Sequence, residues 1–228
     1  MVFTSRALLR LHLEAVWGVQ LPPIIQNSVE FWRGGIQPPW KLYVAEMEGE
    51  QVAIWRSDVA VYDRKALLER ANEAFTVPST EYISQYISRE VALHQVASPT
   101  MSIASAQQVA RLLTPDDQAL VELFDPGEVS YYFHPDRYPL IGVIIEGRLL
   151  SIAHSSRRTA EACELGIETR PEARRKGYAL AATLLWAAQV TQEDLIPFYS
   201  AFANNTASLG LAYAAGYRVF ARGVIVEE

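Results

Sequence analysis

The sequence predicts an α/β protein in which strands and helices alternate along the second half of the chain. Two apolar strands, 139–145 and 148–154, are separated by Glu146-Gly147, which is a short hairpin signal. A third strand at 161–169 leads into a helix at 177–189 that is rich in alanine and leucine. After it we expect a strand at 195–203, a helix at 206–215 with Gly216 as its C′ residue, and a final strand at 217–226.

The start of this second half is marked by a helix signal. Thr114-Pro115-Asp116-Asp117 places a threonine at the N-cap, a proline at the first helical position and an acid at N3. The helix is expected to end at Asp125-Pro126-Gly127. We therefore begin a predicted domain at residue 109 and extend it to 228.

Residues 1–108 are less regular and predict a separate α+β region. Segment 41–58 is typical of a hairpin around Glu48-Gly49-Glu50. Helices are predicted at 63–75 and 80–96, each opened by a polar residue that can cap it. Tryptophans and tyrosines in this region are candidates for holding an amine acceptor by cation–π contact, although most such side chains belong to cores.

Composition narrows the partners and the compartment. The 20 basic and 26 acidic residues give a formal net charge of -6, which argues against a general nucleic-acid binder. The single cysteine, Cys163, excludes an internal disulfide, suits a reducing cytosol and is expected to be a core residue rather than a nucleophile. Four scattered histidines provide no close pair of metal ligands, and His154 is expected to be a polar strand end. No metal site is predicted.

The N-terminus does not have the pattern of an export signal. Arg6, Arg10, His12 and Glu14 interrupt the apolar run that a signal peptide needs. The longest weakly polar run, 178–188, is far shorter than the ~20 residues that span a bilayer. We therefore expect a cytoplasmic protein without a membrane partner.

The junction between strand 161–169 and the following helix has an unusual charge pattern. Arg174, Arg175 and Lys176 lie at a helix N-terminus, which carries partial positive charge and favours anions. A tight strand-to-helix turn exposes main-chain N–H groups, and the small residues Gly177 and Ala179 let a ligand approach them closely. A bound phosphate would make the cations favourable. Neither the Walker pattern nor the dinucleotide Gly-x-Gly-x-x-Gly pattern occurs at such a junction here.

The residues Arg174 to Ala179 fit the pattern Arg-x-x-Gly-x-Ala. Together with the preceding strand ELGIET and the downstream segment NNTASLGLAYAAGY, this pattern resembles the GNAT superfamily of acyl-CoA-dependent N-acyltransferases. The resemblance covers roughly residues 109–228. It implies a mixed, mostly antiparallel sheet flanked by helices, with residues 1–108 as an additional α+β region that helps to bind the acceptor.

The resemblance also implies the residues that bind the acyl donor. The main chain of Ile167, Glu168 and Thr169 pairs with the pantetheine amides as another strand would. The pyrophosphate is held by Arg174, Arg175, Lys176, Gly177, Tyr178 and Ala179. Asn205 either contacts the pantetheine arm or caps the helix that follows it, and Ser208 lies one turn further on the same face.

The catalytic groups are less closely specified. Glu164 is the candidate general base, because the family often places a glutamate on this strand; Glu168 shares its face and is the alternative. A tyrosine of the second helix commonly protonates the leaving thiolate, but the usual position holds Ala212, so Tyr213 is the nearest candidate. Tyr199 and Ser200 are further alternatives, and the thiolate of CoA is also able to leave without an acid.

These expectations define one enzyme hypothesis and one alternative. The first is an N-acetyltransferase that transfers the acetyl group of acetyl-CoA to an amine by direct attack in a ternary complex. The alternative is a non-catalytic CoA-binding sensor or interaction module. Small polyamines, aminoglycosides, amino acids and protein amines all stay open as acceptors, and a homodimer is left open as well.

Overall fold

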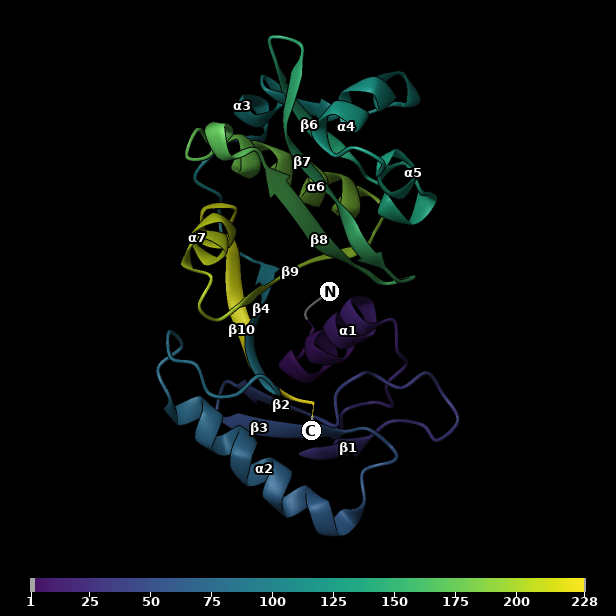
Figure 1. Ribbon diagram of the computed structural model, residues 1–228, viewed down its shortest axis with the longest axis vertical. Coiled ribbons are helices and arrows are strands. Elements are labelled where there is room, and N and C mark those ends of the chain that lie inside the picture. Colours follow the sequence, from purple (N-terminus) through teal and green to yellow (C-terminus); the bar gives the residue numbers. More distant parts are fainter. Residues whose placement is uncertain (1–2, 228) are drawn as a thin grey trace. The chain divides into compact units, whose positions relative to one another are not determined.

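The computed structural model describes residues 3–227, which form ten strands and seven α-helices (Figure 1). In chain order these are α1 (Ser5–Trp17), β1 (Ser28–Glu30), β2 (Leu42–Met47), β3 (Glu50–Trp55), α2 (Val61–Thr76), β4 (Ile87–Gln95), α3 (Ile103–Gln107), β5 (Ala110–Leu112), α4 (Gln118–Phe124), α5 (Val129–Tyr132), β6 (Ile141–Ile145), β7 (Arg148–Arg158), β8 (Ala162–Thr169), α6 (Tyr178–Gln192), β9 (Ile196–Phe202), α7 (Thr206–Ala214) and β10 (Tyr217–Val226).

The predicted fold class is confirmed. Strand pairs β2–β3, β10–β2, β5–β6, β6–β7 and β7–β8 are antiparallel, while β1–β3 and β8–β9 are parallel. The sheet is therefore mixed and mostly antiparallel, and helices flank it. The parallel β8–β9 pair requires a crossover connection, which α6 supplies.

The chain divides into two compact units that do not follow a single cut in the sequence. The first unit contains the residues up to His94, Ser200–Leu209 and the residues from Val219 on; the second contains Gln95–Tyr199 and Gly210–Arg218. The C-terminal segments return to the first unit because β10 pairs with β2. The predicted functional division, with acceptor binding in 1–108 and acyl transfer in 109–228, stays a prediction.

In the first unit, two helices cover opposite faces of the strands. Leu9 and Leu13 of α1 pack against side chains such as Tyr43 and Ile54, whereas Leu67 of α2 packs against their neighbours on the opposite face. This separation follows from the two-residue period of β2 and β3, whose successive side chains point to opposite sides. The hairpin predicted around Glu48-Gly49-Glu50 is confirmed by the β2–β3 register.

In the second unit, α6 and α4 contribute to the two sides of β6–β8. Trp186 of α6 is buried and donates a hydrogen bond from Nε1 to Oγ of Ser155 on β7 (3.2 Å). Val121 and Phe124 of α4 join Ile152 of β7 in a separate apolar cluster. Since Ser155 and Ile152 lie on opposite faces of β7, each face of this strand has its own core.

Most predicted elements of the second half are confirmed. The capping box at Thr114 is present, with Asp117 Oδ2 accepting from the Thr114 N–H at 2.9 Å. The helix ends at Phe124, directly before the predicted stop at Asp125-Pro126-Gly127. Gly216 follows α7 with φ +88°.

Two predictions for the first half were incomplete or wrong. The helix predicted at 80–96 is wrong, because 87–95 form strand β4. The helix at 63–75 is confirmed as α2, but it begins at Val61, so Asp63 lies in its first turn. Helix α1, capped by the Thr4 side chain, was not predicted from the sequence.

Candidate active site

The turn before α6 presents main-chain N–H groups that have no acceptor within residues 3–227. The first intrahelical hydrogen bond of α6 runs from the Ala181 N–H to the Gly177 carbonyl (3.0 Å), so the N–H groups of 178–180 precede it. Among residues 3–227, no side chain caps this helix, and its first turn contains no acidic residue. The start of α6 thus has the donors and the dipole of an anion site.

The backbone of this turn has the geometry that the predicted pattern requires. Gly177 is the N-cap residue of α6 with φ +81°, and Arg175 has φ +59°. Left-handed conformations at two of three successive positions turn the chain sharply. The side chains of Arg174, Arg175 and Lys176 are exposed, and we find no ion pair for them in the described part of the chain. Their charge is therefore available to a ligand.

The strand before this turn, β8, is paired on only part of its second edge. Within residues 3–227, its parallel ladder with β9 ends at the pair Glu164–Phe198. The Arg170 N–H donates to the Leu150 carbonyl of β7 (2.9 Å), and the Ile196 N–H donates to the Glu161 carbonyl (3.0 Å). Because main-chain groups alternate along a strand, even-numbered residues face β7 and odd-numbered ones face the β9 side.

This alternation bears on the predicted pantetheine contacts. The main-chain groups of Ile167 and Thr169 lie on the edge beyond the β9 ladder, where an extended ligand is able to pair with them. Those of Glu168 face β7, and its carbonyl accepts a hydrogen bond from Ser151 Oγ (2.9 Å). Ile167 and Thr169 are therefore the better-placed members of the predicted trio, which stays a prediction.

Glu164 and Glu168 lie on the same face of β8 but in different surroundings. Glu164 is buried, with 4% of its surface exposed. Glu168 is exposed, and its carboxylate accepts a hydrogen bond from Tyr132 of α5 (2.8 Å). Burial, followed by the hydrogen bond to Glu168, raises the pKa of Tyr132 well above its ordinary value. Glu168 is thus held by a neutral phenol, whereas Glu164 is enclosed in the core of the unit.

His154 of β7 lies directly over Gly166, between the two glutamates on this face. A Cβ on Gly166 would meet the imidazole Cε1 at 2.4 Å, so the absence of a side chain makes room for the ring. The rings of Tyr131 and Tyr132 contact it edge-on at 5.6 and 5.3 Å, and the Tyr131 hydroxyl is 3.2 Å from Nε2. The sequence did not reveal this cluster, because α5 is about twenty residues from His154 in the chain.

The surroundings of His154 predict a pH-dependent stability. Burial, and secondarily the charge of Arg137, lowers its pKa to about 4 from an ordinary 6.5. As the pH falls, the unfolded chain binds the proton before the folded protein does. The contribution of His154 to folding stability is therefore complete above pH 6.5 and is lost as the pH falls towards 4. Between pH 7 and 5 the loss amounts to about 2 kcal/mol. Urea unfolding at both pH values should show this loss in the unaltered protein.

One variant isolates the contribution of His154. In His154→Phe the loss of folding stability between pH 7 and 5 should shrink by about 2 kcal/mol, because the buried imidazole is absent. An unchanged loss in His154→Phe would show that the imidazole titrates normally in the folded protein.

Asn205, Ser208 and the alternative catalytic residue Ser200 belong to the first unit, whereas the other predicted site residues belong to the second. The Asn205 side-chain oxygen accepts a hydrogen bond from the Ser208 N–H (3.1 Å), so Asn205 caps α7, one of the two roles considered for it. The Asn205 amide nitrogen is exposed with the rest of the side chain. A contact with the acyl donor therefore stays a prediction.

The tyrosines near the end of α7 differ strongly in burial. Tyr213 is 44% exposed, and its ring centroid lies 6.0 Å from the Arg218 guanidinium, while Ala212 faces the core. Tyr217, at the start of β10, is fully buried, and its hydroxyl has no hydrogen-bond partner among residues 3–227. Burial, and then the charge of Glu164, raises the pKa of Tyr217 well above 10. Tyr217 is thus close enough to the candidate base for the charge of Glu164 to affect it.

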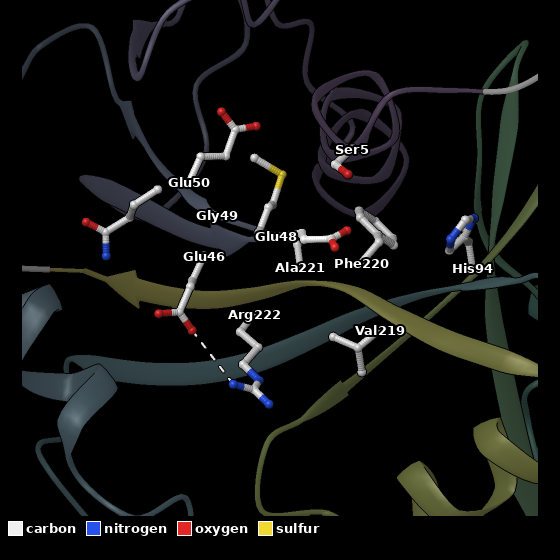
Figure 2. A pocket seen from close by; sticks show the side chains of 12 residues that line it. Ser5, Glu46, Glu48, Gly49, Glu50, His94, Val219, Phe220, Ala221 and Arg222 are labelled. Carbon is white, nitrogen blue, oxygen red and sulfur yellow. Dashed lines mark ion pairs between the residues drawn. The ribbon is translucent and has the colours of Figure 1, made fainter.

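The first unit contains a cavity of about 820 Å³ between the β2–β3 hairpin and strands β4 and β10 (Figure 2). Glu46, Glu48 and Glu50 line it, together with His94 and Phe220. Glu50 accepts a hydrogen bond from Arg6 (2.5 Å), which lowers the pKa of Glu50, and Glu46 lies 3.8 Å from Arg222. The Phe220 ring contacts the rings of His12 and His94 edge-on. The cavity therefore combines an aromatic wall with carboxylates that are partly neutralised.

Other candidate features are less informative. Within residues 3–227 there is no group of three or more histidine, cysteine, aspartate or glutamate residues that is placed to hold a metal ion. Cys163 is buried, as predicted, and burial raises the pKa of its thiol. Among the helices described, none is long and apolar enough to cross a bilayer.

Comparison with known protein families identifies the family to which the chain belongs. The model of the GNAT acetyltransferase family matches residues 54–221, which is most of the chain. The chain belongs to the GNAT acetyltransferase family. Membership supports an acyltransferase activity that uses an acyl-CoA donor. No curated protein matches the chain.

Solved structures of the GNAT family show the same fold. The chain is similar to a GNAT acetyltransferase from Colwellia psychrerythraea, at 10% identity and a TM-score of 0.53, covering 76% of this chain and 75% of that one. A GCN5-related N-acetyltransferase from Sphaerobacter thermophilus gives 13% identity and a TM-score of 0.50, with 80% and 75% covered. A GNAT acetyltransferase from Novosphingobium aromaticivorans is 20% identical over 65% of this chain and 66% of that one, at a TM-score of 0.47.

Proposed function

We propose that this GNAT protein transfers the acetyl group of acetyl-CoA to an amine by direct attack in a ternary complex. The observation that carries the proposal is the start of α6, where donors without acceptors, a left-handed glycine and three exposed cations meet. Dipole, N–H donors and cations all favour one diphosphate. Bound there, the donor is able to extend along the open edge of β8, towards Ile167 and then Glu164.

The chemistry of the proposed reaction needs a base and a stabilised oxyanion. In this proposal Glu164 removes a proton from the attacking amine, directly or through water. A main-chain N–H on the open edge of β8 polarises the thioester carbonyl. The N–C bond forms, the C–S bond breaks, and the sulfur receives a proton from Tyr213 or Tyr217, or from solvent. No covalent enzyme intermediate is required, which agrees with the buried thiol of Cys163.

The acceptor-binding role predicted for residues 1–108 also belongs to this proposal. The cavity at the β2–β3 hairpin has a volume within the range of small-molecule sites. Its carboxylates and the Phe220 ring suit a ligand that carries a positive charge. The single cysteine suits a reaction in the reducing cytoplasm.

A CoA-binding module without turnover is the second candidate. It is favoured by the burial of Glu164 and by the exposure of Tyr213, neither of which is the usual setting of an acid–base pair that meets substrate. Both candidates share the donor site.

Thiol release from acetyl-CoA separates the two candidates. With a panel of polyamines, aminoglycosides, amino acids and peptides, we expect at least one amine to raise thiol release well above the rate of hydrolysis. Initial rates should give intersecting double-reciprocal lines, because both substrates bind before transfer. Tight binding of CoA without amine-dependent thiol release for any acceptor would favour the non-catalytic module.

A further inference from the structure

Helix α5 supports strand β8 on both sides of Ile167. On one side, Tyr132 donates a hydrogen bond from its hydroxyl to Oε1 of Glu168 (2.8 Å). On the other side, the ring of His154 fills the place that a side chain of Gly166 would occupy. The Tyr132 ring contacts this imidazole edge-on, with 5.3 Å between the ring centroids. Tyr132 is therefore in contact with the supports of both chain neighbours of Ile167.

The imidazole of His154 is held in one orientation. The Tyr131 hydroxyl lies 3.2 Å from its Nε2, and the Tyr131 ring contacts it edge-on at 5.6 Å. The Arg137 guanidinium lies 4.2 Å from the centroid of the Tyr131 ring and donates a hydrogen bond to the Ser156 carbonyl of β7, which ties Tyr131 to the sheet. Because His154 is 3% exposed, its close neighbours leave the ring little freedom to turn away from Gly166.

A histidine is an unfavourable choice for a purely structural side chain at this position. Its Nδ1 is buried and has no hydrogen-bond partner within residues 3–227. A buried polar atom without a partner destabilises the fold, whereas a phenyl ring of similar size has no such atom. The imidazole adds the hydrogen bond at Nε2, which fixes the rotation of the ring. Stability lost at such a position is typical of a site that must hold reacting groups in place.

The main chain at Ile167 depends on this support, because β8 has no second neighbouring strand there in the described part of the chain. The parallel ladder between β8 and β9 ends at the pair Glu164–Phe198, which uses the N–H of Leu165. The Ile167 N–H is the next donor on that edge and lies beyond the ladder. Pairing with β7 and the contacts on the face of β8 therefore determine where this N–H points.

We propose that His154 and Tyr132 are positioning residues that hold the Ile167 N–H where it polarises the thioester carbonyl of the acyl donor. The inference rests on the proposed function, in which a main-chain N–H of this edge meets that carbonyl. A displacement of about 1 Å at such a group lowers a reaction rate by up to about 100-fold. Both side chains act through the main chain. Their loss should therefore slow the transfer step and leave the affinity for the donor, which the start of α6 provides, nearly unchanged.

Steady-state kinetics with acetyl-CoA and an amine from the thiol-release panel test the effect on the reaction. His154→Ala should lower kcat by about 10- to 100-fold, and Tyr132→Phe, which loses only one hydroxyl, by about 5- to 20-fold. The KM for acetyl-CoA should stay within about 3-fold. Val143→Ala is the control for a general loss of packing and should keep its kcat, because Val143 is a buried residue of β6, which β7 separates from β8.

A double variant separates positioning from a loss of stability. In Gly166→Ala the added methyl group would meet the imidazole at 2.4 Å, so this variant is also expected to lower kcat. In His154→Ala/Gly166→Ala the methyl group takes part of the space that the ring has left, so kcat should recover by at least about 3-fold relative to His154→Ala. A purely structural role of His154 predicts a lower melting temperature and an unchanged kcat.

Infrared spectra of acetyl-CoA that is isotope-labelled at its carbonyl report on the thioester directly and require no acceptor. Binding to the unaltered protein should lower the carbonyl stretching frequency, and His154→Ala should remove most of this shift. A shift that both His154→Ala and Tyr132→Phe leave unchanged would overturn the inference while the proposed function stands. If no amine raises thiol release but the shift depends on His154, the proposed transfer falls and the positioning role stands. Failure of acetyl-CoA to bind would overturn both.

Discussion

Replacing Gly177 with valine is expected to weaken CoA binding by at least about 100-fold, the equivalent of roughly 2.7 kcal/mol. The valine side chain disfavours φ +81° and would stand where the diphosphate approaches the N–H groups of α6. The protein itself offers no obstacle, because the nearest atom to an added Cβ is Cε of Met101 at 3.5 Å, an ordinary contact. Calorimetry with CoA measures the loss.

A second glycine provides the matched control for this variant. Gly147, in the turn between β6 and β7, has φ +73° and open space around its Cα, so Gly147→Val has a similar conformational cost of about 1–2 kcal/mol. Both variants should show similar losses of thermal stability, while Gly147→Val should keep its affinity for CoA. Equal CoA affinity in the two variants would mean that the start of α6 is not the donor site.

Replacing Glu164 with glutamine is expected to lower kcat by about 10²- to 10⁴-fold, the range for a lost general base. The affinity for CoA should stay within about 3-fold of its original value, because main-chain groups and the α6 turn hold the donor. Single-turnover thiol release with a saturating amine measures the first effect, and calorimetry measures the second.

Glu168→Gln is the control for this variant, since Glu168 lies on the same strand and face and differs in being exposed and bonded to Tyr132. It should change kcat by less than about 10-fold. If Glu168→Gln is the inactive variant and Glu164→Gln is not, the roles of the two carboxylates are reversed. If neither variant affects kcat, the proposed base catalysis by this strand is wrong.

Local sequence signals predicted the helices and strands of the second half of the chain accurately. The capping box at Thr114 and the glycine after α7 are chemical requirements of helix ends, and such requirements depend on a few neighbouring residues. The same holds for the hairpin signal at Glu146-Gly147, where both residues adopt positive φ.

The helix predicted at 80–96 failed because local and tertiary preferences conflict there. Ile83, Ile87 and Val91 recur every four residues and imitate one face of a helix. The segment 87–95 nevertheless forms β4, because a place among the strands satisfies its main-chain groups and buries Val91. Strand pairing between distant segments has no local signature, so single-sequence reasoning does not detect it.

The candidate site shows the same limit. The turn at 174–179 was predictable, because its charges are unfavourable without an anion and its glycine is next to them. The cluster of His154 with Tyr131 over Gly166, and the position of Tyr217 near Glu164, depend on packing between segments that are far apart in the chain. A sequence lists these residues without showing that they meet.

The central claim is that the N–H groups at the start of α6 bind the diphosphate of coenzyme A. Amide NMR spectra of the 15N-labelled protein test it most directly, because each N–H reports its own hydrogen bond. On titration with CoA, the amides of Gly177 to Leu180 should show the largest shifts, and 4′-phosphopantetheine, with one phosphate in place of the diphosphate, should shift them less. Binding of CoA that leaves these amides unmoved would contradict the account.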